Sequence, residues 1–542
     1  MMCGVAGIIN PGCGTASPDL ALKILSRLRN RGSDGTGLLV VGEKGSSLQR
    51  WGGDAAAIPA PARNALERSA HDPIHLCLGH VRYATTGTTA QTNIHPAVAI
   101  LERGSGRRPV RLSLVMNGEV SFTEPWRAEA ARDGIEMGNA QTDSATCAGR
   151  ILTHYLRSSE LPAALVAFYK EAFPLGGFTI LGLLEDKERS FFYLRDGLRP
   201  LHMTRVGSML VFASETAHLT GLEHADEPVS IPAGEIGICP LPDCGKSHQS
   251  SKDLRFQILD MNRELSGVSS RGLCSFELAY LQHHTSVVEG RTIDSIRNDF
   301  GRVLCRAHPP GDGAAVAPVP RSGISAADGY LSEARQGSIA VRTSPAVIRL
   351  NGEKPMARSF LGNGNDEIAS RLRSKFVLNP ASLDEPGGVI LIDDSIVRGD
   401  VCAWLSSVWQ EKGGDDLSIY SAWPPIIAPC YAGIDLHRED LFALRFASVE
   451  ETLTNPRALE DQMSAGFTHR QFGRIEDLTL RYAPHQEIRA ILSEILSGEI
   501  CTGCFDLRYN YICPANLHAV PDFLVDYAAK NRVEMPVCKK EG

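Results

Sequence analysis

Two adjacent aspartates, Asp393 and Asp394, follow a short apolar run and precede a polar loop that carries a glycine. Three of the four residues in the run Val389–Ile392 are β-branched, which suits the centre of a parallel sheet. Because ligands collect beyond the carboxyl ends of such strands, we expect both carboxylates to line a site. Adjacent carboxylates can hold two ribose hydroxyls or a hydrated Mg²⁺, and a turn rich in free N–H groups at a helix start can bind a phosphate.

Length and composition predict a multidomain globular chain. At 542 residues it exceeds one ordinary core, and such a length corresponds to roughly two to four domains. Hydrophobic residues make up 43% and charged residues 22%, as in average soluble proteins. No apolar run is long enough to cross a bilayer and the first residues lack the pattern of a signal peptide, so we expect a cytoplasmic protein with no membrane partner. A net charge of −8 gives no reason to expect nucleic acid as a partner.

Hydrophobic periodicity changes along the chain. Up to about residue 245, short β-type runs mix with helical segments, which predicts an α+β fold. The polar, turn-rich stretch Pro242–Lys252 is interpreted as a linker or surface loop, and beyond it strand, loop and helix alternate as in an α/β fold. The expected strands are Val5–Ile9, Leu38–Val41, Leu112–Val115, Thr179–Leu184, Ser190–Leu194, Ala314–Pro318, Ala346–Leu350, Val389–Ile392 and Leu417–Ala422, and the expected helices are Leu20–Leu28, Ser144–Leu156, Ala326–Ala334, Asn365–Arg373 and Val401–Glu411.

The N-terminal half contains a cysteine and three further segments that fit one mechanism. Cys3 begins a strand-like run, and by itself it is compatible with an ordinary core strand. The segments Asn30–Gly37, Gly79–Gly87 and Met116–Gly118 follow in order. Together with Cys3 they resemble the glutaminase segments of the N-terminal-nucleophile, or class II, glutamine amidotransferases.

The resemblance implies how glutamine would be hydrolysed. A free α-amino group, with an unperturbed pKa of about 8, would serve as base for the thiol of Cys3. Asn117 and the N–H of Gly118 would stabilise the oxyanion. Arg82 would bind the substrate carboxylate and Asp143 its α-ammonium. Each also has a simpler reading: a surface ion pair for Arg82, a hairpin turn for Asn117 and Gly118, and a helix cap for Asp143.

The N-terminal half departs from the usual sequence of these amidotransferases in three places. The doubled methionine matters because aminopeptidase removes Met only ahead of small residues, so we expect either translation from Met2 or cleavage of a short pro-segment to free Cys3. Met116 stands where the family usually has histidine, and Asn30 replaces the His of an Arg-His-Arg-Gly run. Neither replacement removes a group that the mechanism needs.

The resemblance continues over nearly the whole chain and narrows to amidophosphoribosyltransferases. It implies an α+β N-terminal-nucleophile (αββα) glutaminase domain at residues 3–245. An α/β type I phosphoribosyltransferase-like domain would follow at 246–500, and a C-terminal segment with cluster-binding cysteines at 501–542. The segments that carry it are Arg195–Leu201, Ala213–Thr216, Cys274–Glu277, Pro318–Gly323, Val389–Gly399 and Trp423–Asp435.

In that family, ammonia from glutamine displaces pyrophosphate from 5-phosphoribosyl diphosphate in the presence of Mg²⁺, which gives phosphoribosylamine for purine biosynthesis. The resemblance implies that Val319–Gly323 forms the pyrophosphate loop. Loop closure over the substrate would keep water out while ammonia crosses from the first site. The implied acceptor-binding residues are Asp393 and Asp394 at the ribose hydroxyls, Ser395, Arg398 and Gly399 around the 5′-phosphate, and Arg358 on the closing loop.

Departures from the family concentrate in this acceptor site. Asp400 and Val401 replace Thr-Thr, and Arg321 replaces an aspartate. A carboxylate ~4 Å from a phosphate costs about 1–4 kcal/mol at dielectrics between those of water and a protein surface. One interpretation is an altered acceptor that lacks the diphosphate or places its charge elsewhere. The other is tolerated drift, with Asp400 capping the following helix and its carboxylate turned away.

Four cysteines complete the pattern. Cys501 and Cys504 form a C-x-x-C pair, which also fits zinc or redox chemistry. Cluster-bearing members of the family hold a [4Fe–4S] centre with cysteines at the positions of Cys274, Cys430, Cys501 and Cys504. The resemblance therefore implies a 4Fe-4S cluster with a structural role, with zinc as the alternative.

We therefore expect a cytoplasmic glutamine amidotransferase that binds glutamine and 5-phosphoribosyl diphosphate and forms homo-oligomers like its family. The first alternative is a diverged homologue that aminates another phosphorylated or activated acceptor in specialised metabolism. The second is an inactive scaffold or regulatory homologue.

Overall fold

The computed structural model describes residues 3–10, 15–69, 73–83, 91–104, 108–121, 123–241, 256–264, 271–350, 365–414, 416–430, 432–434, 436, 441–496 and 499–509. In these residues no helix is long and apolar enough to cross a membrane.

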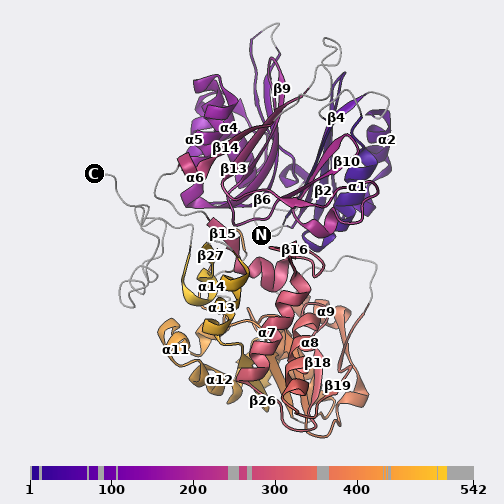
Figure 1. The fold of residues 1–542 in the computed structure, drawn as a ribbon, viewed down its shortest axis with the longest axis vertical. Coiled ribbons are helices and arrows are strands. Elements are labelled where there is room, and N and C mark those ends of the chain that lie inside the picture. Colours follow the sequence, from indigo (N-terminus) through magenta and orange to yellow (C-terminus); the bar gives the residue numbers. More distant parts are fainter. Residues whose placement is uncertain are drawn as a thin grey trace, which may run out of the picture.

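The upper body in Figure 1 contains two seven-stranded sheets that face each other, with helices on both outer faces. The inner faces bury an apolar layer, for example Val5 and Leu78 against Leu181. Helices α1 (Pro18–Arg27) and α2 (Ala60–Ser69) cover one sheet, and α3 (Glu124–Arg132), α4 (Asp143–Ser158) and α5 (Leu161–Ala172) cover the other. In spatial order, the first sheet is β12 (Val229–Ser230), β10 (His202–Val206), β11 (Met209–Ala213), β1 (Gly4–Ile9), β4 (Ile74–Arg82), β2 (Gly35–Gly42) and β3 (Ser46–Gly52). The second is β14 (Gln257–Asp260), β13 (Glu235–Pro240), β9 (Arg189–Arg195), β8 (Gly176–Glu185), β6 (Val110–Val120), β5 (Ala97–Leu101) and β7 (Ile135–Glu136).

The lower body is built on a parallel five-stranded sheet. Its strand β22 (Val389–Asp393) alternates sides, so that Ile390 and Ile392 enter one core while Val389 and Leu391 enter the other. A strand buried on both faces explains the unbroken apolar run in the sequence. The other strands, in spatial order around β22, are β19 (Arg342–Thr343) and β18 (Ala315–Pro318) on one side and β23 (Leu417–Ser421) and β26 (Leu478–Tyr482) on the other.

Helices pack on both faces of this sheet. One face carries α7 (Ile293–Ala307), α8 (Ile324–Gln336) and α13 (His485–Ile495), and the other carries α9 (Asn365–Lys375), α10 (Asp400–Glu411) and α12 (Pro456–Ser464). Smaller elements are α6 (Met261–Glu264), β16 (Val287–Val288), β17 (Arg291–Thr292), β20 (Val347–Arg349), β21 (Phe376–Leu378), α11 (Val449–Thr454), β24 (Phe467–His469) and β25 (Gly473–Ile475).

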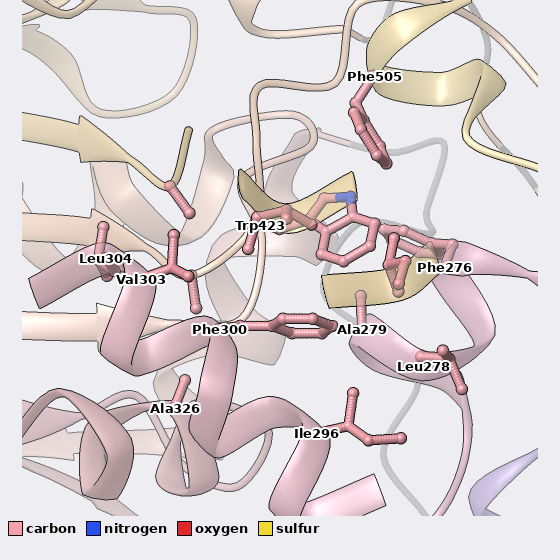
Figure 2. Close-up of a cluster of buried hydrophobic side chains, with 14 of the residues drawn as sticks. Phe276, Leu278, Ala279, Ile296, Phe300, Val303, Leu304, Ala326, Trp423 and Phe505 are labelled. Atoms are coloured by element: carbon pink, nitrogen blue, oxygen red, sulfur yellow. The ribbon is translucent and has the colours of Figure 1, made fainter. Parts of the chain in front are cut away.

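A third group of elements lies between the two bodies in Figure 1, where β15 (Arg271–Cys274) pairs in parallel with β27 (Glu499–Cys501) next to α14 (Gly503–Asp506). Figure 2 shows Trp423 between Phe300 of α7 and Phe505 of α14. The ring centroids are 5.3 Å apart for Trp423 and Phe300 and 5.2 Å apart for Trp423 and Phe505, both edge-on. Aromatic pairs in this geometry add to the free energy of burial, so the last described helix is part of the core of the lower body.

The expected change from an α+β to an α/β pattern is confirmed, and each expected strand and helix is present, with ends shifted by at most five residues; the largest shift is in β6, which runs on to Val120 where Leu112–Val115 was expected. The expected linker Pro242–Lys252 lies outside the described residues.

Candidate functional site

Strand pairing places Cys3 next to Arg82. Gly4, the first residue of β1, pairs with Val81 at the end of β4. Cys3 is only 3% exposed. Burial raises the pKa of its thiol, while a backbone hydrogen bond from Tyr83 and the positive charge of Arg82 act in the opposite direction.

The charges of the buried Arg82 and the partly buried Asp143 both act on the same thiol. Arg82 is 5% exposed, so it is not the surface ion pair of the simpler reading. Burial lowers the pKa of Arg82, and the charges of Cys3, Asp34 and Asp143 counteract it. The two charged groups expected to bind glutamine therefore lie within electrostatic reach of the expected nucleophile.

Asp143 is the first residue of α4, but the helix cap is Thr142, whose hydroxyl accepts a hydrogen bond from the N–H of Ala145. The carboxylate of Asp143 instead accepts a hydrogen bond from the N–H of Val120, with an N–O distance of 3.1 Å. Burial first, and the charge of Glu119 second, raise the pKa of Asp143 to about 7. A partly buried carboxylate of this kind gains from a cationic ligand.

Asn117 and Gly118 lie inside β6, so they do not form a hairpin turn. The side chain of Asn117 is fully buried, and neither its amide nitrogen nor its oxygen has a hydrogen-bond partner within the described parts of the chain. Gly118 has φ of +125°, and a Cβ atom there would lie 1.9 Å from the carbonyl oxygen of Gly177. An unpaired buried amide is costly, which is a reason to expect a ligand at this position.

Two histidines that were not predicted as site residues contact the backbone of β6 just before Asn117. The rings of His80 and His95 stack with centroids 3.9 Å apart. Nε2 of His80 lies 3.2 Å from the carbonyl oxygen of Met116, and Nδ1 of His95 accepts a hydrogen bond from the N–H of Met116 at 3.2 Å. Burial, followed by the charge of Arg82, lowers the pKa of His80 to about 3, so its ring is neutral at physiological pH. His80 and His95 contact only the backbone of Met116. These contacts therefore do not depend on the side chain at this position, where the family has histidine.

A second site lies at the carboxyl end of β22, as expected. The pocket is open to solvent, and its volume with the open solvent included is about 560 Å³. The carboxylate of Asp393 accepts the N–H of Asp394 at 2.9 Å, and Asp394 accepts the hydroxyl of Ser395 at 3.0 Å. Burial, and then the neighbouring charge of Asp394, raise the pKa of Asp393 well above its ordinary value. Lining residues include Val319, Pro320, Ser322, Asp393, Asp394, Ser395, Arg398, Gly399, Asp400 and Val401.

The loop after these carboxylates enters α10 through Gly399. This glycine has φ of +79°, and a Cβ atom there would lie 2.6 Å from the ring of Phe442. Asp400 is the first residue of α10 and does not cap it, because Gly399 occupies the N-cap position without a side-chain bond. Oδ1 of Asp400 instead lies 3.1 Å from Nε2 of His469.

Arg321 is exposed and does not line the pocket, although its neighbours Pro320 and Ser322 do. Arg358 lies outside the described residues.

The four expected cysteines come together at the junction of the two bodies. Cys274 pairs with Cys501 across β15 and β27. The N–H groups of Ile427 and Ala428 donate to the carbonyl oxygen of Cys504, which brings the segment of Cys430 alongside. Burial raises the pKa of the Cys504 thiol, and the charges of Cys274, Cys501 and Cys430 raise it further. The thiols are thus within electrostatic reach of one another.

The described residues contain no group of three His, Cys, Asp or Glu side chains in the geometry of a single metal ion. A four-iron cube binds each thiolate through a different iron, so its ligands need not converge as they do around one ion. Three buried thiols and the partly buried thiol of Cys430 come from three separate segments, next to the guanidinium of Arg199, and four cysteines are the donor set of such a cube.

No family model matches the chain. Its relatives include an amidophosphoribosyltransferase of Methanothermobacter thermautotrophicus, which is 26% identical over 524 residues, or 95% of this chain and 96% of the relative. Another, from Mycobacterium tuberculosis, is 28% identical over 518 residues, or 94% of this chain and 86% of the relative. Similarity along nearly the whole length covers both bodies.

A solved structure of glutamine phosphoribosylpyrophosphate amidotransferase from B. subtilis, complexed with ADP and GMP, has the same fold. Its TM-score is 0.70 at 21% identity, and the match covers 94% of this chain and 97% of that one. This match confirms the expected order of a glutaminase fold followed by a phosphoribosyltransferase fold. In sequence and in fold, the chain is therefore similar along nearly its whole length to amidophosphoribosyltransferases.

Proposed function

We propose that this protein hydrolyses glutamine at Cys3 and transfers the ammonia to 5-phosphoribosyl diphosphate, which gives phosphoribosylamine and pyrophosphate. The observation that carries the proposal is the buried side-chain amide of Asn117, which has no hydrogen-bond partner in the described residues. The same chain also has an acidic pocket at the end of β22, where an acceptor can bind. The full-length similarity to amidophosphoribosyltransferases supports it.

The glutaminase half-reaction uses groups already described. Arg82 binds the α-carboxylate of glutamine and Asp143 its α-ammonium, which fixes the carboxamide relative to Cys3. The α-amino group of a processed Cys3 takes the thiol proton, and the sulfur attacks the carboxamide carbon. The oxyanion that forms accepts hydrogen bonds from the Asn117 amide and the Gly118 N–H. The tetrahedral intermediate then collapses to a thioester as its C–N bond breaks, and the α-ammonium group of Cys3 returns the proton to the departing nitrogen, which leaves as ammonia. Water hydrolyses the thioester, which releases glutamate and restores the thiol.

The acceptor half-reaction takes place at the second pocket. Asp393 and Asp394 bind the ribose hydroxyls, and the loop of Ser395, Arg398 and Gly399 binds the 5′-phosphate at the start of α10. Mg²⁺ held at the acidic pair and the diphosphate would neutralise charge on the leaving group. Arg358 belongs to the segment that we expect to close over the substrate.

We further propose that Cys274, Cys430, Cys501 and Cys504 ligate a 4Fe-4S cluster that ties the C-terminal segment to the lower body. Structural zinc is the alternative occupant. Iron and sulfide analysis of anaerobically prepared protein, together with its visible absorbance, distinguishes the two. Stoichiometric zinc without sulfide would reject the cluster.

The domain limits 3–245, 246–500 and 501–542 are part of the proposal, although β14 and α6, which follow residue 245, pack on the upper body. A cytoplasmic location and a homo-oligomeric state are proposed from the family. Fractionation and analytical ultracentrifugation test them.

The reaction is tested by supplying glutamine, Mg²⁺ and 5-phosphoribosyl diphosphate to the processed protein and measuring glutamate and pyrophosphate. Both products should appear, and Cys3→Ala should abolish glutamate while ammonium salts still support pyrophosphate release. Glutamate without pyrophosphate would mean another acceptor. No glutamate from the processed parent would favour an inactive scaffold.

A further inference from the structure

Four buried charged side chains form a cluster at the junction of the two bodies. Arg31, Arg199 and Glu215 come from the upper body, and Glu277 comes from the segment that follows β15. Their side chains are at most 1% exposed. Two positive and two negative charges balance, which is the condition under which charges can be buried together.

Arg31 connects this cluster to the backbone of the nucleophile. Its Nε donates to the carbonyl oxygen of Cys3 at 2.9 Å. Its other two nitrogens bind Glu277 in a bidentate pair, with N–O distances of 2.9 and 3.1 Å. Nη1 also donates to Glu215 at 2.7 Å. Glu215 holds one nitrogen of the guanidinium, whereas Glu277 holds two and so fixes its plane.

Glu277 is held in turn by Arg199. Nη1 of Arg199 donates to Oε1 of Glu277 at 3.2 Å, and Nη2 donates to the carbonyl oxygen of Ala432. Every carboxylate oxygen of Glu277 therefore accepts a hydrogen bond, and its position is determined by elements on both sides of the junction.

We propose that Glu277 is a positioning residue for the nucleophile, which it orients through Arg31. The inference rests on the proposed function, in which Cys3 is the nucleophile of glutamine hydrolysis. A residue from beyond the glutaminase sheets thus completes the glutaminase site, which makes that site dependent on the junction between the bodies.

The expected effect is on the chemical step and not on glutamine binding. Arg82 and Asp143 bind the substrate, and neither is in the charge cluster. If the guanidinium plane of Arg31 turns, the Cys3 carbonyl loses its fixed donor and the thiol shifts relative to the carboxamide. Shifts on the order of 1 Å in a reacting group cost up to about 100-fold in rate.

Glu277→Gln is the first test, because the side chain keeps its shape while an N–H group replaces one acceptor facing Arg31. In steady-state glutamine hydrolysis by the processed holoprotein, we expect kcat to fall about 10- to 100-fold with KM within about twofold. Ammonia-dependent pyrophosphate release should stay at the parent level. Glu129→Gln is the matched control, because Glu129 of α3 also pairs with two arginines, Arg150 and Arg157 of α4, but lies outside the charge cluster, and kcat should not change.

A double-mutant cycle tests whether Glu277 acts through Arg31. Arg31→Lys removes the planar fork, so the double variant should be no slower than the slower single variant. Additive losses, or an unchanged kcat in Glu277→Gln, would overturn the proposal. If Glu277→Gln does not give soluble protein, Glu277→Asp serves the same test, since it keeps the charge and withdraws the carboxylate by one methylene. A parent protein that hydrolyses no glutamine would reject the proposed function instead.

Discussion

Nε2 of His469 lies 3.1 Å from Oδ1 of Asp400, and both side chains are buried. Nδ1 of the same ring accepts the N–H of Gln471 at 3.2 Å, so the ring proton is on Nε2 and is donated to Asp400. The ring also stacks on Phe472. The second oxygen of Asp400 is buried and has no hydrogen-bond partner in the described residues. The carboxylate is therefore held in place at the wall of the acceptor pocket.

Asp400→Asn should strengthen the binding of 5-phosphoribosyl diphosphate. The amide keeps the acceptor oxygen that His469 needs and removes a negative charge from the phosphate loop. A repulsion of about 1–4 kcal/mol corresponds to an affinity gain of at least about fivefold. Calorimetric titration with Mg²⁺ present measures it, with Asp461→Asn at an exposed position as control. Equal or weaker binding would show that the carboxylate does not repel the ligand.

Asn117→Ala should lower the kcat of glutamine hydrolysis by about 10²- to 10³-fold, the usual loss for one oxyanion donor. Thermal stability should not fall, because the Asn117 amide makes no hydrogen bond with the described residues and its removal relieves a buried polar group. Kinetics and a melting curve check both parts. Asn64→Ala, at an exposed position of α2, should lower neither. A destabilised but fully active variant would contradict the assignment.

Glutamine binding should weaken as the pH falls below about 7. Asp143 has its pKa raised to about 7 by burial and by Glu119, so its carboxylate becomes protonated below that pH and no longer attracts the α-ammonium. The Kd of glutamine for Cys3→Ala should approach a tenfold rise for each unit below the pKa of Asp143. Asp143→Asn should bind weakly at every pH. If the Kd of glutamine changed with pH in the same way in Cys3→Ala and in Asp143→Asn, the titrating group would not be Asp143.

Phe505→Ala should loosen the C-terminal segment from the lower body. Removal of a buried phenylalanine from the contact with Trp423 costs about 3–5 kcal/mol. Hydrogen exchange of peptides that cover residues 499–509 should become faster, and iron content should decrease if the cluster is present. Ile258→Ala, at a side chain that is 47% exposed, is the control. Unchanged exchange in Phe505→Ala would mean that the ring does not anchor this segment.

The framework of the fold could be predicted from the sequence because its central strands are buried on both faces. Val389–Ile392 was expected as a strand that ends in two carboxylates, and it is β22 with Asp393 and Asp394 at the pocket. Cys3 and Arg82 were expected in one site from the resemblance, and the pairing of Gly4 with Val81 places them together.

Contacts between distant side chains could not be predicted. His469 is 69 positions from Asp400, in a short strand with no motif of its own. Glu277 and Arg31 are 246 positions apart, and although both lie in segments that resemble the family, nothing in either segment indicates that they meet. Single polar contacts of this kind depend on how the bodies pack, which periodicity does not encode.

The pairing of Cys274 with Cys501 also sets an order of events during translation. Strand β15 leaves the ribosome more than two hundred residues before β27, its partner, and domains generally fold from the N-terminal side during synthesis. During synthesis there is therefore a stage at which Cys274, Cys430 and one edge of β15 have been made while their partners in the C-terminal segment have not. Whatever the four thiols bind can be held by all of them only after Cys504 has left the ribosome.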